Sequence, residues 1–195
     1  SDVYKRQDIR QLIHYNACIN FAKIICMKTL KLRIRDKHTD KLNRLSGAVN
    51  FVWNYVNDLS YKHLKKTGKF FSAYDLNDYT KGSGELLGLH SQTIQAINET
   101  HAKSRRQFKK AKLNWRTNNP SSKRKSLGWL PFKQSAIKHI ATHQTSKKGL
   151  KSTLQLSLAK GQKLIIDLWD SYNLSLYQIN TLEVVQDSRN RWYAC

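Results

Sequence analysis

The sequence predicts an α+β fold in which one β-structure is interrupted by a block of helices. Three observations predict it: residues 27–36 alternate apolar and polar side chains, residues 37–118 repeat apolar side chains at spacings of three and four, and residues 119–195 return to short extended segments. Alternation is typical of a strand that buries one face, and the longer spacing is typical of a helix. We therefore expect the first strand to join the later strands in one sheet.

The first strand leads directly into the first helix. In "MKTLKLRIRD" every second side chain from Leu30 to Ile34 is apolar. The next segment is predicted to be helical up to Gly68, because glycine favours the left-handed conformation at helix ends. Asp36 or Thr39 is expected to cap its start. The predicted buried face of this helix consists of Leu42, Leu45, Val49, Val52, Trp53, Val56 and Leu59.

Two further helices are predicted before the chain becomes extended. "FFSAYDLNDYT" is expected to form a short helix with Ser72 as its N-cap, and the glycine-rich "KGSGELLGL" connects it to a long helix over residues 91–115. The polar stretch "NNPSSKRKS" contains Pro120, which predicts that this helix ends at or before that residue. The predicted apolar face of the long helix consists of Ile94, Ile97, His101, Phe108 and Trp115.

Short strands are predicted in the C-terminal part of the chain. The extended segments are "LGWLPFK", "STLQLSLA", "KLIIDLWD", "LYQINTLEVVQD" and "RWYAC", with "AKGQK" and "DSRNR" as turns between strands. The pattern over residues 139–168 fits a hairpin, but it does not fix the strand register.

The net charge of this chain is unusual. Lys and Arg number 35 against 13 Asp and Glu, a formal charge of +22, and between Glu99 and Asp167 there are seventeen Lys and Arg and no acidic residue. Such an excess favours a polyanionic partner, and the 10% aromatic content without a long apolar run favours nucleic acid over a membrane surface. The alternative is a basic face that is only solvated. With 39% hydrophobic residues the chain can bury a core, which excludes a disordered tail.

The first 26 residues are predicted not to be native. "SDVYKRQ" is one reading frame of TCAGATGTGTATAAGAGACAG, the transposon mosaic end that is ligated to fragments in sequencing libraries, and Met27 is the next candidate start. Residues 8–26 are too short and too interrupted by polar side chains to span a membrane. Cys18, Cys26 and Cys195 give neither a disulfide framework nor a zinc-ligand spacing, which favours a reducing compartment.

Catalytic patterns are scarce in this sequence. It contains no G-x-S-x-G nucleophile elbow and no G-x-x-x-x-G-K phosphate loop. His139 and His143 have the spacing of metal ligands on a helix, but they fall among predicted strands without a third ligand nearby. The scattered acids form no pair for two-metal nuclease chemistry. We therefore expect no catalytic residue and no metal site in this chain.

Six segments carry a resemblance to a known family. They are, in chain order, "NFVWNYVNDLS", "LGLHSQTIQA", "RRQFKKAKLNWR", "SLGWLPFK", "WDSYNL" and "DSRNRWY". Together they resemble the N-terminal part of the TnpB or OrfB proteins of insertion sequences, which are often described as transposases. The resemblance extends from Met27 to Cys195 and depends on the ordered set, because each segment alone is a weak motif.

The resemblance implies a fold and an activity. TnpB proteins are RNA-guided DNA endonucleases related to the ancestors of type V CRISPR effectors, and the expected fold is a partial wedge-type β-barrel interrupted by a helical recognition insert. Residues 27–36 would form the first wedge strand, residues 37–118 the recognition insert and residues 119–195 the remaining wedge strands, truncated before the RuvC-like nuclease domain. Such a fragment is expected to bind nucleic acid without cutting DNA. It would need no cofactor, whereas the full-length family is expected to use magnesium and zinc.

The resemblance also implies partners and contact residues. The expected partners are a guide RNA from the transposon end and double-stranded target DNA, in prokaryotic cytoplasm at the nucleoid, without a membrane. Tyr74, Ser91, Gln92 and Gln95 match positions that contact the target-adjacent DNA motif, and a Gln amide can form two bonds to a base edge. Ser91 equally suits the N-cap of its helix.

Ten cations are expected to contact the phosphates of the guide RNA or its heteroduplex, which positions the nucleic acid without reading its sequence. These residues are Lys103, Arg105, Arg106, Lys109, Lys110, Lys112, Arg116, Lys123, Arg124 and Lys125. Trp129 and Phe132 allow stacking on a base, but core packing is the favoured interpretation because they flank a proline.

A different class of function stays open beside this one. The chain can instead be a stand-alone basic DNA- or RNA-binding regulatory module without nuclease activity. A true DNA transposase has less support, because no catalytic tyrosine or acidic triad is identifiable in the sequence.

Overall fold

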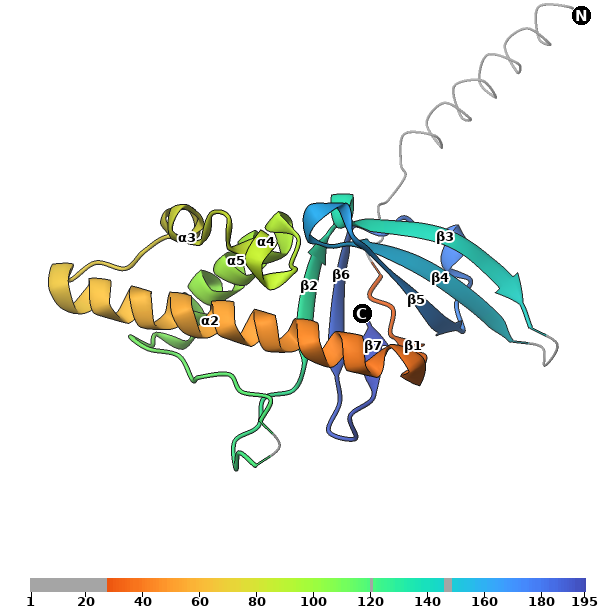
Figure 1. The fold of residues 1–195 in the computed structure, drawn as a ribbon, viewed down its shortest axis with the longest axis horizontal. Helices are drawn as coiled ribbons and strands as arrows, with labels where there is room; N and C mark the ends of the chain where they lie inside the picture. Colours follow the sequence, from red (N-terminus) through yellow and green to blue (C-terminus); the bar gives the residue numbers. More distant parts are fainter. Residues whose placement is uncertain (1–27, 120, 146–148) are drawn as a thin grey trace, which may run out of the picture.

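Seven antiparallel strands form one curled sheet that bends into a half-barrel (Figure 1). The computed structural model of the protein describes residues 28–119, 121–145 and 149–195. The strand order along the sheet is β2-β6-β7-β1-β5-β4-β3. The strands are β1 (Leu32–Ile34), β2 (Trp129–Lys133), β3 (Ile137–Gln144), β4 (Leu150–Ser157), β5 (Lys163–Asp170), β6 (Thr181–Gln186) and β7 (Trp192–Ala194). The predicted α+β class is confirmed.

Strand β1 lies inside the sheet, although the helical block separates it in sequence from every other strand. It pairs with β5 on one side and β7 on the other, and Arg33 lies opposite both Trp169 and Tyr193. Leu32 and Ile34 are buried on the other face of β1. Alternation therefore fixes which face of β1 enters the core, and the prediction that the first strand joins the later ones is confirmed.

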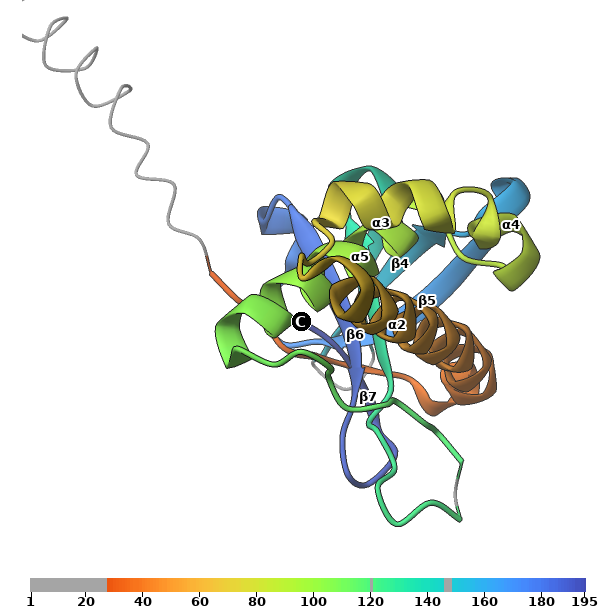
Figure 2. The same cartoon turned by 90° about the vertical axis from the view of Figure 1, so that its left-hand side faces the viewer.

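Four α-helices lie between β1 and β2: α2 (Thr39–Thr67), α3 (Ala73–Thr80), α4 (Ser83–Leu87) and α5 (Ser91–Phe108). Helices α2 and α5 pack side by side, and α3 packs against α5 (Figure 2). Four short 3-10 turns complete the described elements: η1 (Asp36–His38), η2 (Gln134–Ala136), η3 (Ala159–Gly161) and η4 (Leu174–Leu176).

For α2 and α3 the helix ends agree with the sequence at two of three predicted caps. Gly68 ends α2 in the left-handed conformation with φ 70°, and its N–H donates to the carbonyl of Leu64. Ser72 caps α3 in a reciprocal capping box with Asp75. The predicted cap of α2 by Asp36 or Thr39 is wrong: the N-cap position is His38, without a side-chain bond, while Asp36 instead pairs with Arg33.

Helix α5 ends earlier than predicted. The pattern favours a helix to residue 115, but α5 stops at Phe108 and Lys109 takes a left-handed conformation with φ 52°. The chain beyond it is held by side chains of α2. The amide of Asn57 bonds the backbone N–H and carbonyl of Leu113, and the amide of Asn54 does the same for Arg116. These bonds replace the helical bonds that the segment would otherwise form.

The early end of α5 also changes its predicted apolar face. Ile94, Ile97 and His101 are buried as predicted, but Phe108 and Trp115 are 60% and 54% exposed. The two aromatic residues lie at and beyond the helix end, where the helical spacing no longer directs them to the core.

The region whose register the sequence left open is a hairpin of β3 and β4. Its pairing shifts between His139 and Ala141, which marks a β-bulge. This irregularity explains why β3 lacks a clean alternating pattern. The two predicted turns are confirmed: Lys160 and Gly161 turn the chain between β4 and β5, and Asn190 does so between β6 and β7, all with positive φ.

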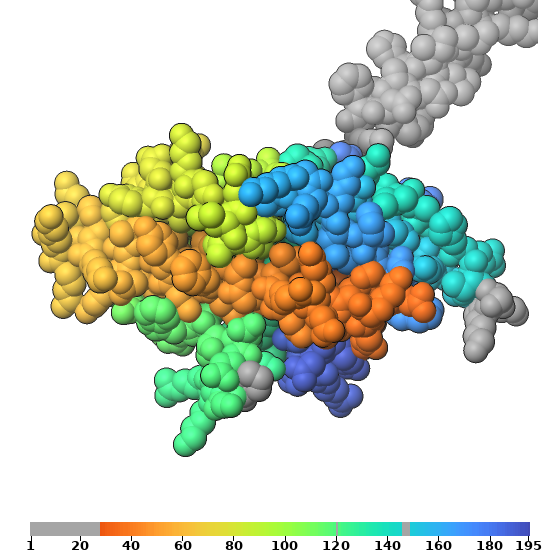
Figure 3. All heavy atoms as spheres, viewed as in Figure 1, coloured from red at the N-terminus to blue at the C-terminus, as the bar shows by residue number. Residues whose placement is uncertain are grey.

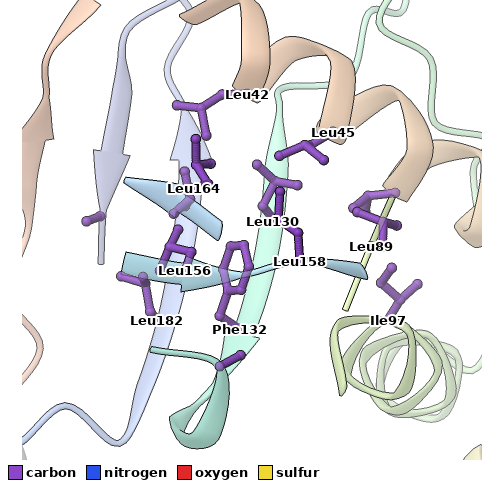
Figure 4. Packing of buried hydrophobic residues seen from close by; sticks show 14 of the residues in the cluster. Leu42, Leu45, Leu89, Ile97, Leu130, Phe132, Leu156, Leu158, Leu164 and Leu182 are labelled. Atoms are coloured by element: carbon purple, nitrogen blue, oxygen red, sulfur yellow. The ribbon is translucent and has the colours of Figure 1, made fainter. Parts of the chain in front are cut away.

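One hydrophobic core joins the sheet to the helices. Figure 4 shows Leu42 and Leu45 of α2 directed toward the inner face of the sheet, and Ile97 of α5 beside the same core. Leu130, Leu156 and Leu182 from three strands fill the centre, and Leu130 and Leu156 are fully buried. In the part of the chain that the structure describes, no helix combines the length and apolarity needed to cross a membrane.

Candidate nucleic-acid interface

Four exposed cations surround the end of α5. Lys103 and Arg106 lie on its last turns, and Lys109 and Lys110 follow at its C-cap. None of the four forms an ion pair with any residue that the structure describes. We call these four residues the α5 basic cluster. Its charges are available to an external anion.

The acids at the two ends of the acid-free stretch are already paired. Glu99 binds the Lys133 ammonium at 2.6 Å, and Asp167 binds Lys37 at 2.6 Å and Lys151 at 3.3 Å. Burial alone would raise the pKa of Asp167, but hydrogen bonds from Lys37, Thr153 and Lys151 outweigh it and hold the pKa at about 2. Glu99 lies on α5 one turn before Lys103, but its carboxylate is already paired with Lys133, and the Asp167 carboxylate is paired with two other lysines.

Arg105 points inward instead of joining its neighbours. Its guanidinium donates to the carbonyl of Phe71 at 2.5 Å and lies 4.1 Å from the centre of the Phe70 ring. Burial, followed by the nearby charge of Arg106, lowers the pKa of Arg105. Only 7% of the residue is exposed, so it ties α5 to the segment before α3 rather than presenting a charge to solvent.

Arg116 is also directed into the protein. Its guanidinium donates to Asn50 Oδ1 at 2.9 Å and to the carbonyl of Leu127 at 2.7 Å, and it lies 5.8 and 5.6 Å from the centres of the Trp53 and Trp129 rings. Burial lowers the pKa of this side chain. The sequence-based expectation of phosphate contact therefore does not fit Arg105 or Arg116, because internal acceptors occupy both.

The other predicted phosphate contacts divide into two groups. Lys112 is half-buried, lies 3.5 Å from Asp58 and sits over the rings of Tyr61 and Trp115. The second group is exposed in the loop before β2, whose tip stands out from the body in Figure 3. One of its ammonium groups donates to Asn190 at 3.3 Å, which links this loop to the β6–β7 turn. The group consists of Lys123, Arg124 and Lys125, the donor being Lys125.

The structure brings together two of the four predicted motif contacts. Ser91 and Gln95 line a hollow of about 600 Å³ between the helices and the β4–β5 turn. Gln92 points elsewhere and accepts a hydrogen bond from Ser135. Tyr74 lies on α3, is 85% exposed and is not part of the hollow.

The N-cap of α5 is His90, one residue before the predicted position. Its Nδ1 accepts from the N–H of Gln92 at 3.3 Å. Ser91 is therefore not the cap, and its exposed side chain faces the hollow.

The hollow combines hydrogen-bond donors and acceptors. Its walls carry amide, carboxylate and ammonium groups from four elements of the chain, together with three glycines, Gly82, Gly84 and Gly161. Such a mixture of groups can form hydrogen bonds with the edges of bases. A carboxylate accepts a hydrogen bond from the cytosine amine, and an amide bonds adenine. The polar side chains concerned are Asn77, Asp78, Lys81, Glu85, Gln95 and Lys160.

The aromatic residues of "GWLPF" pack inside the protein, as the favoured interpretation predicted. Phe132 is 3% exposed. Trp129 meets the edge of Trp53 with ring centres 6.1 Å apart. Gly128 precedes them because a Cβ there would lie 2.2 Å from the ring of Trp192.

The two histidines with ligand-like spacing lie on β3 on either side of its bulge. His139 Nε2 is 3.0 Å from the hydroxyl of Thr142, and His143 is exposed. Among the described residues, no group of three or more His, Cys, Asp or Glu side chains has the arrangement of a metal site.

Sequence reasoning missed a set of aromatic and basic side chains on the outer face of the sheet. Trp169 and Tyr193 flank Arg33 there. The alternation of Lys31, Arg33 and Arg35 with apolar residues indicated an outward basic face on β1. Which aromatic residues lie beside it depends on strand order, which the local pattern does not contain.

Comparison of the chain with protein-family models finds no match, and comparison with curated proteins finds none either.

Proposed function

We propose that this protein binds nucleic acid, as the RNA-holding N-terminal part of an insertion-sequence-encoded, RNA-guided DNA endonuclease of the TnpB type. The observation that carries the binding proposal is the α5 basic cluster: four exposed cations without an acidic partner among the described residues. The phosphate groups of a nucleic acid can serve as the anionic partners of these cations. Release of counterions from the nucleic acid drives such contacts.

The order of elements supports the assignment to this family. A strand, a block of helices and then further strands of the same sheet are the arrangement expected for a wedge barrel interrupted by a recognition insert. In this proposal the half-barrel is the wedge part and α2 to α5 are the recognition part. Guide RNA lies along the α5 basic cluster and the loop that carries Lys123, Arg124 and Lys125.

The hollow beside α5 is the proposed reader of the target-adjacent DNA motif. Gln95 and Ser91 lie in it together with two carboxylates, which gives both donors and acceptors toward base edges. Positioning by phosphate contacts and reading by base contacts would then occur on different parts of the same helix.

Binding by the α5 basic cluster is tested with two matched triple variants of the full chain. One replaces Lys103, Arg106 and Lys110 by Gln. The control replaces Lys41, Lys138 and Lys163, which are equally exposed and equally free of ion pairs among the described residues. Affinity for a structured RNA is measured by fluorescence anisotropy over a salt series.

The first variant is expected to reduce the slope of log affinity against log salt by about 2 to 3, since each phosphate contact contributes about 0.7–0.9. The control is expected to leave the slope nearly unchanged. If both variants weaken binding and lower the slope equally, the basic charge acts only as a diffuse field and the cluster is not the binding site.

A second comparison separates the guided nuclease from the stand-alone module. The full chain is titrated with RNA transcribed from the DNA that follows its own coding sequence and with an unrelated structured RNA of equal length. A large advantage for the first RNA that persists at high salt supports the TnpB-type proposal. Parallel weakening of both RNAs favours a regulatory module that binds RNA without a cognate guide.

A further inference from the structure

The outer face of the sheet carries a row of three side chains across neighbouring strands. Trp169 on β5 and Tyr193 on β7 both lie opposite Arg33 on β1. Trp169 is 51% exposed, and Tyr193 and Arg33 are half-buried. The row lies on the face opposite the buried Leu32 and Ile34, so it is directed away from the core.

Cations lie over the rings of this row. The Arg35 guanidinium is 5.2 Å from the centre of the Trp169 ring, and Lys31 Nζ and the Arg33 guanidinium are 4.4 and 5.7 Å from that of Tyr193. These distances are in the range of cation–π contacts. Flat apolar surfaces and positive charges thus occupy the same area, which is the combination that binds an unpaired base together with its phosphate.

Three of the acids near the row are engaged, and one of them is Asp187, which accepts a hydrogen bond from the Tyr193 hydroxyl at 3.3 Å and pairs with Arg191 at 2.7 Å. Asp36 pairs with Arg33 at 2.5 Å, and Asp167 is only 6% exposed beneath its lysine partners. Lys31 and Arg35 form no ion pair with a described residue. The excess positive charge is small, so an anionic ligand here would depend mainly on stacking.

The spacing of the rings favours a single strand over a duplex. Adjacent strands lie about 4.8 Å apart, so Trp169 and Tyr193, two strands from each other, are separated by about 10 Å. That separation suits two bases of one extended strand, each covering one ring. In a duplex the faces of the bases are hidden in the stack and cannot reach the rings.

We propose that this face of β5, β1 and β7 binds single-stranded nucleic acid by stacking unpaired bases on Trp169 and Tyr193, with the phosphates on the cations beside them. The outer-face platform, as we call it, consists of Lys31, Arg33, Arg35, Lys151, Trp169 and Tyr193. It lies on elements different from those of the α5 basic cluster, and it does not rest on the function proposed for that cluster.

The test uses the full chain and three fluorescein-labelled probes: a ten-nucleotide oligo-U RNA, an oligo-dT strand of the same length and a duplex of oligo-dA with oligo-dT. Trp169→Ala is expected to weaken binding of a single strand roughly 5- to 150-fold, the range for loss of one stacked base. Trp169→Phe is expected to retain most of the affinity. Phe51→Ala is the matched control, because Phe51 on α2 is 63% exposed and distant from this face in sequence and element.

Stacking is not ionic, so Trp169→Ala should lower single-strand affinity at every salt concentration without changing the salt slope. The duplex should bind Trp169→Ala as it binds the unmodified protein. Unchanged urea midpoints show that the loss is not caused by unfolding. The proposal is overturned if the unmodified protein binds neither single strand, if Phe51→Ala weakens binding as much, or if Trp169→Ala weakens the duplex equally. A failure of the α5 variants alone would leave these readouts unaffected, so the two proposals fail separately.

Discussion

Cations from one basic stretch of sequence have two different environments in this protein. Arg105 and Arg116 are directed inward, where backbone carbonyls and an asparagine accept their hydrogen bonds, whereas Lys103, Arg106 and Lys110 are exposed without an acidic partner among the described residues. A buried guanidinium loses its contacts with water, and fixed hydrogen-bond acceptors must replace them. The exposed side chains stay in water and have no such acceptors. A count of charges along the sequence therefore overstates the surface charge available to a ligand.

The largest expected effect comes from Arg116→Leu. This change removes two hydrogen bonds from a charged donor, to Asn50 Oδ1 and to the carbonyl of Leu127, each worth about 1.5–3 kcal/mol. We expect a loss of about 3 kcal/mol or more in the free energy of unfolding, measured with urea. The control Arg106→Leu should change it by less than about 0.5 kcal/mol, because Arg106 is exposed. Similar losses in both variants would show that Arg116 is no more structural than its exposed neighbour.

The next effect is a pH dependence of stability that originates beside Arg105. Burial, followed by the charge of Arg105, lowers the pKa of His101 from 6.5 to about 4. The unfolded chain therefore binds more protons than the folded one between these values, so this contribution to stability is full above pH 6.5 and is lost as the pH falls toward 4. From pH 6.5 to 4.5 the expected loss is about 2 kcal/mol, because the full slope of about 1.36 kcal/mol per unit holds only between the two pKa values.

His101→Phe keeps an aromatic ring against Trp53 and removes the titrating group. Urea unfolding of this variant should depend less steeply on pH over the same interval. His143→Phe, at an exposed position, is the matched control and should keep the slope of the unmodified protein. An unchanged slope in His101→Phe would assign the pH dependence to other groups.

A smaller effect is expected from Asn54→Ala. The Asn54 amide bonds both backbone groups of Arg116 at 2.8 Å, and it is only partly buried. Loss of two bonds of about 0.5–1.5 kcal/mol each predicts a destabilisation of about 1–2 kcal/mol. Amide hydrogen exchange should quicken at Arg116 and its neighbours while α5 stays protected. Equal exchange in both proteins would show that the α2 asparagines do not hold this segment.

Much of the fold was predictable because it depends on local patterns. The alternation around Leu32, the glycine at position 68 and the capping box of Ser72 each act over a few residues, and all three predictions are confirmed. The end of α5 was not predictable in this way. Residues 109–115 have helical spacing, and only the amides of Asn54 and Asn57 on α2 provide a better set of hydrogen bonds.

The candidate site was predictable in part for the same reason. The exposed cations at the end of α5 follow in part from the acid-free stretch, since Glu99 is the one acid in the sequence within a helical turn of them. The structure adds that Glu99 pairs with Lys133 instead. The separation of Tyr74 and Gln92 from the hollow follows from how α3 and η2 lie against α5, which the motif itself does not encode. The burial of the Arg105 and Arg116 side chains also depends on tertiary packing that the local sequence does not encode.

By itself the sequence determined the α+β class, the strand faces, the main turns and the excess of positive charge. The first three depend on the spacing of residues within short segments, and the net charge is a sum over the composition. The tertiary structure decided which arginines are buried and where α5 ends, because distant acceptors compete with solvent and with the helix. It also decided that Trp169, Arg33 and Tyr193 form one row. That arrangement exists only through the order β7-β1-β5, which joins strands far apart along the chain.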